Sequence, residues 1–311
     1  MNARVKRWAG VALRVVAVLV VIGAGALLCR RIDLHSVGAA LAGASLSLVA
    51  LAAALNLGQV VVRALCLRVM LAHVRVVGTL RLVRYNLGMY AANNLLPGRA
   101  GELVRVHLLK ARDGVPASTT IAVALVEKVF DVVALLVLVL PLPLVMHTLP
   151  PTARHALWLL GAIGALALVA SWLVVRFGAR GPAWLARIAE GASSVSRPKP
   201  FAAALGLSVL AYAIDAAEVA LCMAAVGIPV DAAAPLLVLL GVAVALSVPS
   251  TPSSLGALEL GAVAALRLVG VDPERALAFA LIYHFMQLIP VTLLGLDGIR
   301  LAALTRTATT S

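Results

Sequence analysis

The sequence predicts an all-α, polytopic membrane protein with six transmembrane helices and two re-entrant helical hairpins in an inverted-topology repeat. Its 311 residues are 63% hydrophobic and 13% charged, with a mean hydropathy of +1.06. This composition is far too apolar for a water-soluble domain of that length, and apolar runs of about 20 residues recur along it. No long hydrophilic segment is left over. We therefore expect one integral membrane domain over residues 1–311, with repeat halves of about 1–150 and 151–311.

The apolar runs give the spans in chain order. The first run follows basic residues as a signal peptide does, but it lacks a small-x-small cleavage site near its end, so we expect it to remain as a helix. The six predicted spans are 8–28, 45–71, 118–140, 156–175, 201–226 and 276–296.

Two segments are expected to dip into the membrane and return on the same side. Residues 79–96 are only moderately apolar and end at Pro97, and the charged residues 99–112 follow at once. Irregular backbone at membrane depth is tolerated where it lines protein or a wet cavity. Residues 235–270 repeat this pattern, with apolar arms on either side of the sequence PSTPSSLG.

The distribution of Lys and Arg favours this topology. With a cytoplasmic N-terminus and both dips treated as hairpins, 17 of these residues fall in cytoplasmic segments and five in external ones. Cytoplasmic loops carry the excess of Lys and Arg, and a full crossing at either dip would move later basic loops to the wrong side. The net charge of +13 therefore indicates orientation and contact with anionic head groups, and no nucleic acid is expected.

The two halves match at a constant offset. Glu102 and Glu259 are 157 residues apart, and the same offset carries 45–71 onto 202–228 and 118–140 onto 275–297. These ranges agree within two residues with two later predicted spans. An inverted repeat follows, in which the hairpin tips enter from opposite sides and meet near the middle of the membrane.

The first hairpin tip carries candidate site residues. Pro97 ends the entering helix and Gly101 permits close approach of the backbone. Glu102 and Arg105 share a helical face, with Arg99 in the turn before them. Guanidinium groups beside a helix N-terminus suit a phosphate. The alternative is plain charge pairing of the arginines with Glu102 and Glu127, and the sequence leaves both open.

Further charges lie inside the spans. Glu127 and Asp131 share a face of the third predicted span, with Lys128 beside it, and an internal ion-pair network is the minimum expectation. Asp215 and Glu218 form a similar pair in the fifth span. They are either neutralised by Arg63 or Arg68 of the second span or take part in proton coupling.

The second hairpin repeats the first with Pro252, Gly256 and Glu259. His284 lies 25 residues after Glu259 and is either a hydrogen-bonded structural group or a group that titrates near neutral pH. Nucleophile-elbow, zinc-protease, phosphate-loop and Cys/His metal-binding motifs are absent from the sequence. We expect no catalytic residue, no metal and no cofactor.

These motifs resemble a flippase-like integral membrane family represented by the transmembrane region of lysylphosphatidylglycerol synthase. The resemblance rests on N-x-L-P-G-R-x-G-E-x-x-R, E-K-x-x-D and P-x-T-P-x-x-x-G-x-x-E, and it covers the chain from about the second span to the last. The matching positions are Asn94, Pro97, Arg99, Gly101, Glu102, Arg105, Glu127, Asp131, Pro252, Gly256 and Glu259.

Three departures from the family pattern concern the same site. The family tends to have Arg at the positions of Lys128 and His284, and Gly-Gly where this chain has Ser253 and Ser254. The soluble aminoacyl-transferring domain of the full synthase is absent from this sequence.

The resemblance implies an integral membrane lipid translocase, or a protein that acts on membrane-anchored lipid or glycolipid carriers beside glycosyltransferases. We expect a bacterial inner-membrane protein that is not an enzyme, with both termini cytoplasmic as the count of Lys and Arg indicates. Its substrate would be an anionic phospholipid or a polyprenyl-phosphate-linked lipid that contacts Arg99, Arg105 and Lys128, and a glycosyltransferase or lipid-modifying enzyme is a candidate partner. The alternatives are a secondary transporter of a small anion and an intramembrane lipid-modifying enzyme that uses Glu127 and Asp131. The oligomeric state is not predicted.

Overall fold

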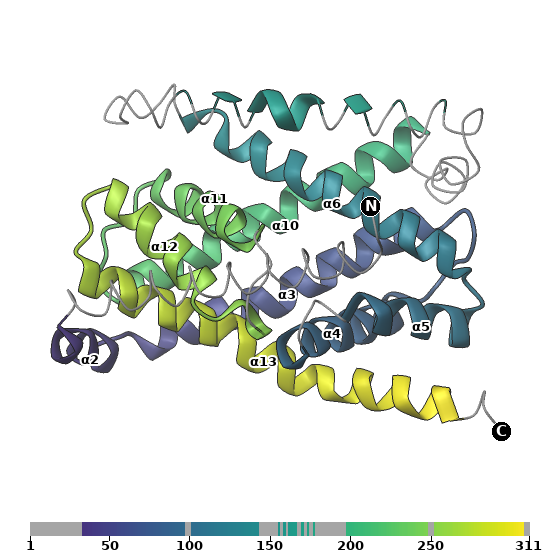
Figure 1. The fold of residues 1–311 in the computed structure, drawn as a ribbon, viewed down its shortest axis with the longest axis horizontal. Helices are drawn as coiled ribbons and strands as arrows, with labels where there is room; N and C mark the ends of the chain where they lie inside the picture. Colours follow the sequence, from purple (N-terminus) through teal and green to yellow (C-terminus); the bar gives the residue numbers. More distant parts are fainter. Residues whose placement is uncertain are drawn as a thin grey trace, which may run out of the picture. The chain divides into compact units, whose positions relative to one another are not determined.

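A computed structural model describes four long segments, 33–96, 101–142, 197–247 and 252–307, and isolated positions between 155 and 177. Every regular element in these residues is helical, with no strand, which confirms the all-α prediction (Figure 1). The first predicted span, nine of the 20 residues of the fourth, and the site residues Pro97 and Arg99 lie outside the described residues. The elements are α2 (Leu34–Ala42), α3 (Leu46–Leu71), α4 (Thr79–Leu95), α5 (Gly101–Asp113), α6 (Ala117–Val139), α10 (Pro198–Ala225), α11 (Ala234–Leu246), η3 (Pro252–Ser254), α12 (Ala257–Leu268) and α13 (Pro273–Thr307).

Three of the described helices are long and apolar enough to cross a membrane. They are α3, α10 and residues Pro273–Thr305 of α13, which coincide with the second, fifth and last predicted spans. Helix α6 coincides with the third predicted span and carries three charged residues in 23. The protein is therefore a multi-pass membrane protein.

The Cα positions group into two compact units that combine distant parts of the chain. One unit contains 1–54, 93–99 and 216–290, and the other contains 55–92, 100–215 and 291–311. Each is described below by itself, and the single membrane domain stays a prediction.

In the second unit, a buried hydrogen bond joins α4 to the end of α5. The buried Tyr85 hydroxyl of α4 donates to Asp113 at the end of α5, at 2.8 Å. Helix α5 ends there because Gly114 adopts a φ of +67°, and the amide of Val115 donates back to the carbonyl of Leu109 at 3.1 Å. The sequence thus folds 79–113 into two helices of about the predicted bounds.

Helix α4 also crosses α13 within this unit. A Cβ atom on Gly298 would lie 2.7 Å from the Cα of Gly88 and 2.8 Å from the carbonyl oxygen of Arg84, so the two backbones touch through glycine. The guanidinium of Arg84 pairs with Asp297 beside the crossing.

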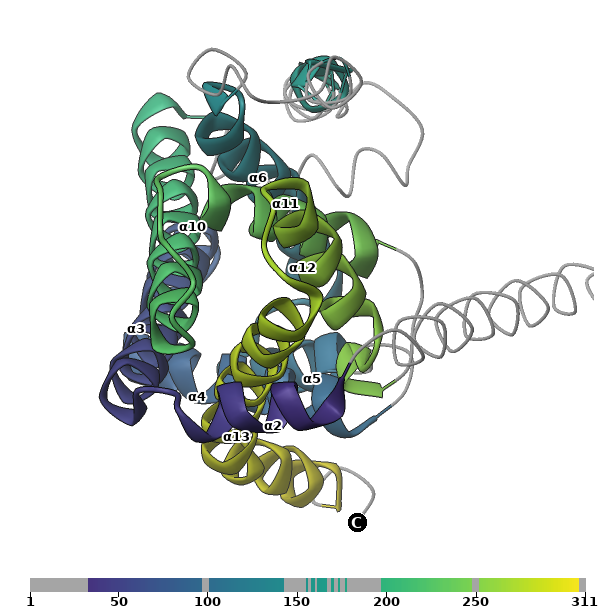
Figure 2. The same ribbon diagram turned by 90° about the vertical axis from the view of Figure 1, so that its left-hand side faces the viewer.

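In the first unit, α11 and α12 pack along each other, as both ribbon views show (Figures 1 and 2). Gly241 and Gly261 face each other at the contact, and a Cβ on Gly241 would lie 2.6 Å from the carbonyl oxygen of Gly261. The short helix η3 lies between them in the chain. The second predicted hairpin therefore has two helical arms in close contact.

Candidate functional site

Arg105 is the buried centre of an ion-pair cluster in the second unit. Its side chain is 3% exposed, and Nη2 donates to Glu102 Oε2 at 2.9 Å and to Glu127 Oε2 at 2.6 Å. Glu102 lies one turn earlier on α5, where a carboxylate also favours the helix N-terminus, and Glu127 comes from α6. Charge pairing, one of the two alternatives left open by the sequence, is the arrangement observed.

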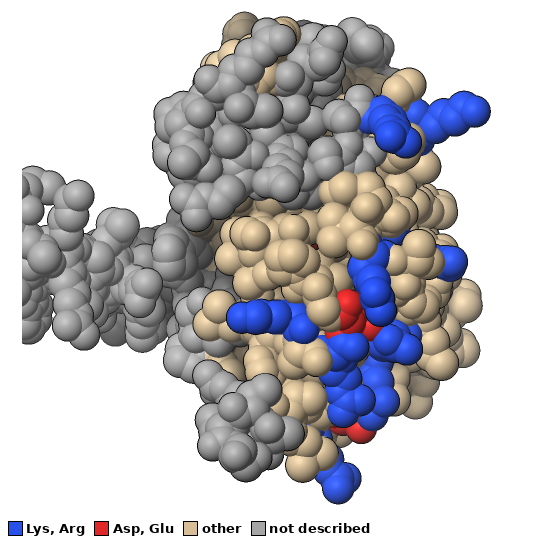
Figure 3. Space-filling model, turned by 90° about the vertical axis from the view of Figure 1, so that its right-hand side faces the viewer, with Lys and Arg blue, Asp and Glu red and all other residues tan. Residues whose placement is uncertain are grey.

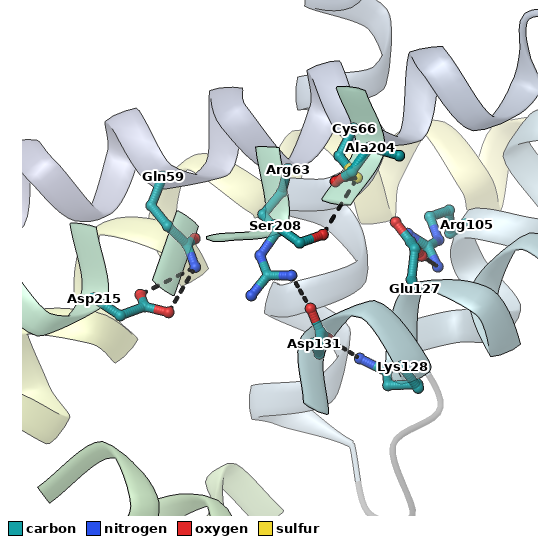
Figure 4. A network of polar contacts seen from close by, with 10 residues as sticks. All are labelled: Gln59, Arg63, Cys66, Arg105, Glu127, Lys128, Asp131, Ala204, Ser208 and Asp215. Carbon is teal, nitrogen blue, oxygen red and sulfur yellow. Dashed lines mark hydrogen bonds and ion pairs between the residues drawn. The ribbon is translucent and has the colours of Figure 1, made fainter. Parts of the chain in front are cut away.

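A second ion-pair cluster is built around Asp131 of α6 (Figure 4). Arg63 of α3 pairs with one carboxylate oxygen of Asp131, and Lys128 Nζ lies 3.4 Å from the other. The guanidinium carbon of Arg63 lies 5.2 Å from the ring centroid of Tyr212. Arg63 and Asp131 are each 15% exposed, whereas the Lys128 side chain is 63% exposed. Lys128 is therefore the accessible cation of this cluster.

Asp215 of α10 binds an amide in place of a cation. Gln59 Nε2 of α3 donates to its two carboxylate oxygens at 3.0 and 3.3 Å. Arg63 is engaged with Asp131, and Arg68 donates to Thr79. The sequence thus missed Gln59, and it named Arg63 as a partner of Asp215 and not of Asp131. The four-residue spacing of Gln59 and Arg63 inside an apolar span was the available signal.

In the first unit, Glu259 lies in the first turn of α12 and joins this helix to α13. One carboxylate oxygen accepts the backbone N–H of Gly256 at 2.7 Å, and the other lies 2.7 Å from Nδ1 of His284. Gly256 has a φ of +85°, a conformation that glycine adopts without strain. Since both side chains are largely buried, the contact fixes the start of α12 against α13.

The turn before α12 touches the end of α4 within the same unit. Ser253 Oγ donates to the backbone carbonyl of Asn94 at 2.7 Å. The tip of the second predicted hairpin therefore contacts the last turn of the first hairpin's entering helix. Pro252 opens the turn as the first residue of η3.

The family comparison decides the class of protein. The family model described as the lysylphosphatidylglycerol synthase TM region matches residues 14–295. The chain belongs to this family. Comparison with curated proteins and with solved structures gave no match.

The lysylphosphatidylglycerol synthase TM match covers all the described site residues, which fall into two sets. In the second unit Gly101 begins α5, and the ion pairs of the two clusters involve Glu102, Arg105, Glu127, Lys128 and Asp131. In the first unit the residues are Asn94, Pro252, Gly256, Glu259 and His284. Among the described residues no group of three or more His, Cys, Asp or Glu side chains could hold a metal ion.

Basic side chains gather on one face of the molecule (Figure 3). Exposed Lys and Arg residues of the second unit include Arg81 and Arg84 of α4, Lys110 and Arg112 of α5, and Arg300 of α13. Among them, Arg81 pairs with Asp113 and Arg84 with Asp297. Such a basic face suits the surface of an anionic membrane leaflet.

Ser253 and Ser254 both have positive φ, 57° and 60°, where a side chain is strained. This geometry is a physical reason for glycine to be favoured at these two positions. We expect Ser254→Gly to stabilise the protein by about 1 kcal/mol, because glycine adopts this conformation freely. Ser253→Gly should gain less, because it also loses the hydrogen bond to Asn94. Equilibrium unfolding in detergent would measure both, and a loss of stability in Ser254→Gly would contradict the expectation.

Proposed function

We propose that this protein is a lipid flippase-like protein that translocates or presents an anionic phospholipid or a polyprenyl-phosphate-linked lipid across the inner membrane. The observation that carries the proposal is the position of Lys128 on the exposed face of α6. Family membership supports a role in lipid handling.

Lys128 lies within an apolar stripe. Ile121, Leu125 and Val132 precede and follow it at helical spacing, and they are 51%, 49% and 46% exposed. A cation in the middle of an otherwise apolar, accessible helix face suits a head-group phosphate with its hydrocarbon tail along the same face. A small soluble anion would favour a polar, enclosed wall instead, so this stripe favours a lipid.

The neighbouring ion pairs leave Lys128 only weakly bound within the protein. Arg63 satisfies one oxygen of Asp131, so Lys128 is bound to that carboxylate by a single contact at 3.4 Å. Exchanging that contact for a phosphate oxygen costs little, because Asp131 keeps its arginine. Arg105 binds two carboxylates through Nη2 and holds α5 against α6.

The proposed architecture is the inverted repeat with six spans and two hairpins, with both termini cytoplasmic. An offset of 157 residues carries α4 onto 236–252 and α5 onto 258–270, which overlap α11 and α12. The same offset carries Glu102 onto Glu259 and Glu127 onto His284. Glu102 and Glu127 both bind Arg105, whereas Glu259 contacts His284 directly. The hydrogen bond of Ser253 to Asn94 supports a meeting of the hairpin tips.

Translocation in liposomes tests the proposal. Lys128→Gln should lower the rate for fluorescent anionic phospholipid or polyprenyl phosphate about tenfold, the effect of losing roughly 1.4 kcal/mol of charge-assisted contact. Lys128→Arg should retain most of the rate. Lys199→Gln is the matched control, because this lysine is exposed at the start of α10 and outside the site.

Equal rates in wild type and Lys128→Gln would contradict the proposed site. Uptake of a small anion without movement of any lipid would favour a secondary anion transporter. Chemical change of the lipid that depends on Glu127 and Asp131 would favour an intramembrane lipid-modifying enzyme. A glycosyltransferase or lipid-modifying enzyme that supplies or consumes the lipid remains the proposed partner.

A further inference from the structure

A buried carboxylate of the second unit lacks a cation of its own. Asp215 is 9% exposed, and its hydrogen bonds are the two donated by the neutral amide of Gln59. Gln59 lies at the middle of α3, well inside an apolar helix. A charged carboxylate in such a place is costly unless it is paired.

The surrounding charges already balance without Asp215. In the described part of the site, the cations Arg63, Arg105 and Lys128 are matched by the carboxylates in their ion pairs, which are Glu102, Glu127 and Asp131. An ionised Asp215 would add one uncompensated negative charge. A proton on Asp215 removes it.

Three helices bring other charged or titratable groups to the surroundings of Asp215. Helix α3 brings Gln59 and Arg63, α6 brings Asp131, and Tyr212 lies one turn earlier on α10 with its ring beside Arg63. Figure 4 shows Arg63 between Asp215 and Asp131. Glu218 follows Asp215 by three residues on α10. One arginine thus lies between two carboxylates.

We propose that Asp215, held by Gln59, is a proton-binding site in the membrane interior whose occupancy controls the availability of Lys128. With the proton bound, Arg63 forms its ion pair with Asp131. Lys128 can then leave Asp131 and bind a head-group phosphate. With the proton released, Arg63 is drawn toward Asp215. Lys128 then becomes the main ion-pair partner of Asp131, and it no longer binds the lipid head group.

Gln59 suits both states. Its Nε2 lies 3.0 and 3.3 Å from the two carboxylate oxygens, so its amide N–H can donate to the ionised carboxylate or to the carbonyl oxygen of the protonated acid. A rotation of its terminal amide would let its carbonyl oxygen accept the O–H of the protonated acid. The inference rests on the proposed function for its effect on transport, whereas the proton site itself can be tested separately.

Infrared difference spectroscopy of the purified full-length protein tests the proton site. The difference spectrum of wild type between about pH 5 and about pH 8, a range in which buried carboxyl groups can titrate, should show a protonated-carboxyl stretching band. Asp215→Asn should lose that band, and Asp215→Glu should shift it. Asp231→Asn is the matched control, because Asp231 is exposed and accepts backbone N–H groups at the start of α11. A spectrum unchanged by Asp215→Asn would overturn the proton site.

Lipid translocation at varied pH tests the coupling. A single titrating carboxyl gives up to about a tenfold fall in rate per pH unit as its proton is lost. The translocation rates of wild type and Asp231→Asn should fall in this way as the pH rises. The rate of Asp215→Asn should change less than about twofold over the same range. Lipid transport without pH dependence in wild type would overturn the coupling and leave the proposed function intact. Absence of any lipid transport would contradict the proposed function, while the infrared result still decides the proton site.

Discussion

Arg105→Ala should destabilise the protein by about 3–5 kcal/mol, the range for removing one partner of a buried ion pair. The guanidinium is 3% exposed and binds Glu102 and Glu127 through one nitrogen. Without it, two carboxylates face each other. Glu102 is 34% exposed and can turn toward water, whereas Glu127 is 12% exposed and keeps most of the penalty. Equilibrium unfolding of the purified protein in detergent measures the loss.

Two further variants separate the effect of burial on the loss of stability from the effect of the unpaired charge. Arg84→Ala removes an ion pair whose partners are 47% and 56% exposed, so it should cost no more than about 1 kcal/mol. The double variant Arg105→Leu/Glu127→Gln should lose less than Arg105→Ala, because it also removes the buried negative charge. A cost for Arg105→Ala no larger than for Arg84→Ala would show that the pair contributes little.

The ion-pair partners show how far sequence reasoning reaches. Glu102 and Arg105 could be paired from their spacing of three, because neighbours on one helical face follow from helix geometry alone. The partners of Arg63 and Asp215 could not, because these contacts join residues 68 and 156 apart. They depend on how α3, α6 and α10 pack, and local sequence carries no direct record of that packing.

The helix bounds were easier to predict than the turns. Pro97 and the charges after it marked the break between α4 and α5, because proline and charge oppose a continuing apolar helix. The turn before α12 was harder. Serine at 253 and 254 gives no sign of positive φ, and the hydrogen bond to Asn94 depends on tertiary contact. The match of Glu259 with His284 was visible only as a spacing of 25 residues.

Gly261→Ala should destabilise the protein, against the usual direction for glycine in a helix. Alanine is normally favoured over glycine by about 0.5–1 kcal/mol. Here its Cβ would lie 2.5 Å from the carbonyl oxygen of Gly241 and 2.9 Å from the Cβ of Ala245. Backbone cannot yield locally, so α11 and α12 must separate, and we expect a net loss of about 1–3 kcal/mol. Gly206→Ala is the matched control, because its Cβ would meet open space on α10 and should stabilise.

The same substitution should also disturb the second hairpin's polar contact. Gly261 follows Glu259 by two residues on α12, so moving this helix away from α11 shifts the carboxylate that binds Gly256 and His284. We therefore expect Gly261→Ala and Glu259→Gln to be less than additive in unfolding experiments, because each weakens the same contact. If Gly261→Ala stabilised the protein as much as Gly206→Ala, helices α11 and α12 would not be held together at the contact of Gly241 with Gly261. Strict additivity with Glu259→Gln would mean that the close approach of α11 and α12 does not position Glu259.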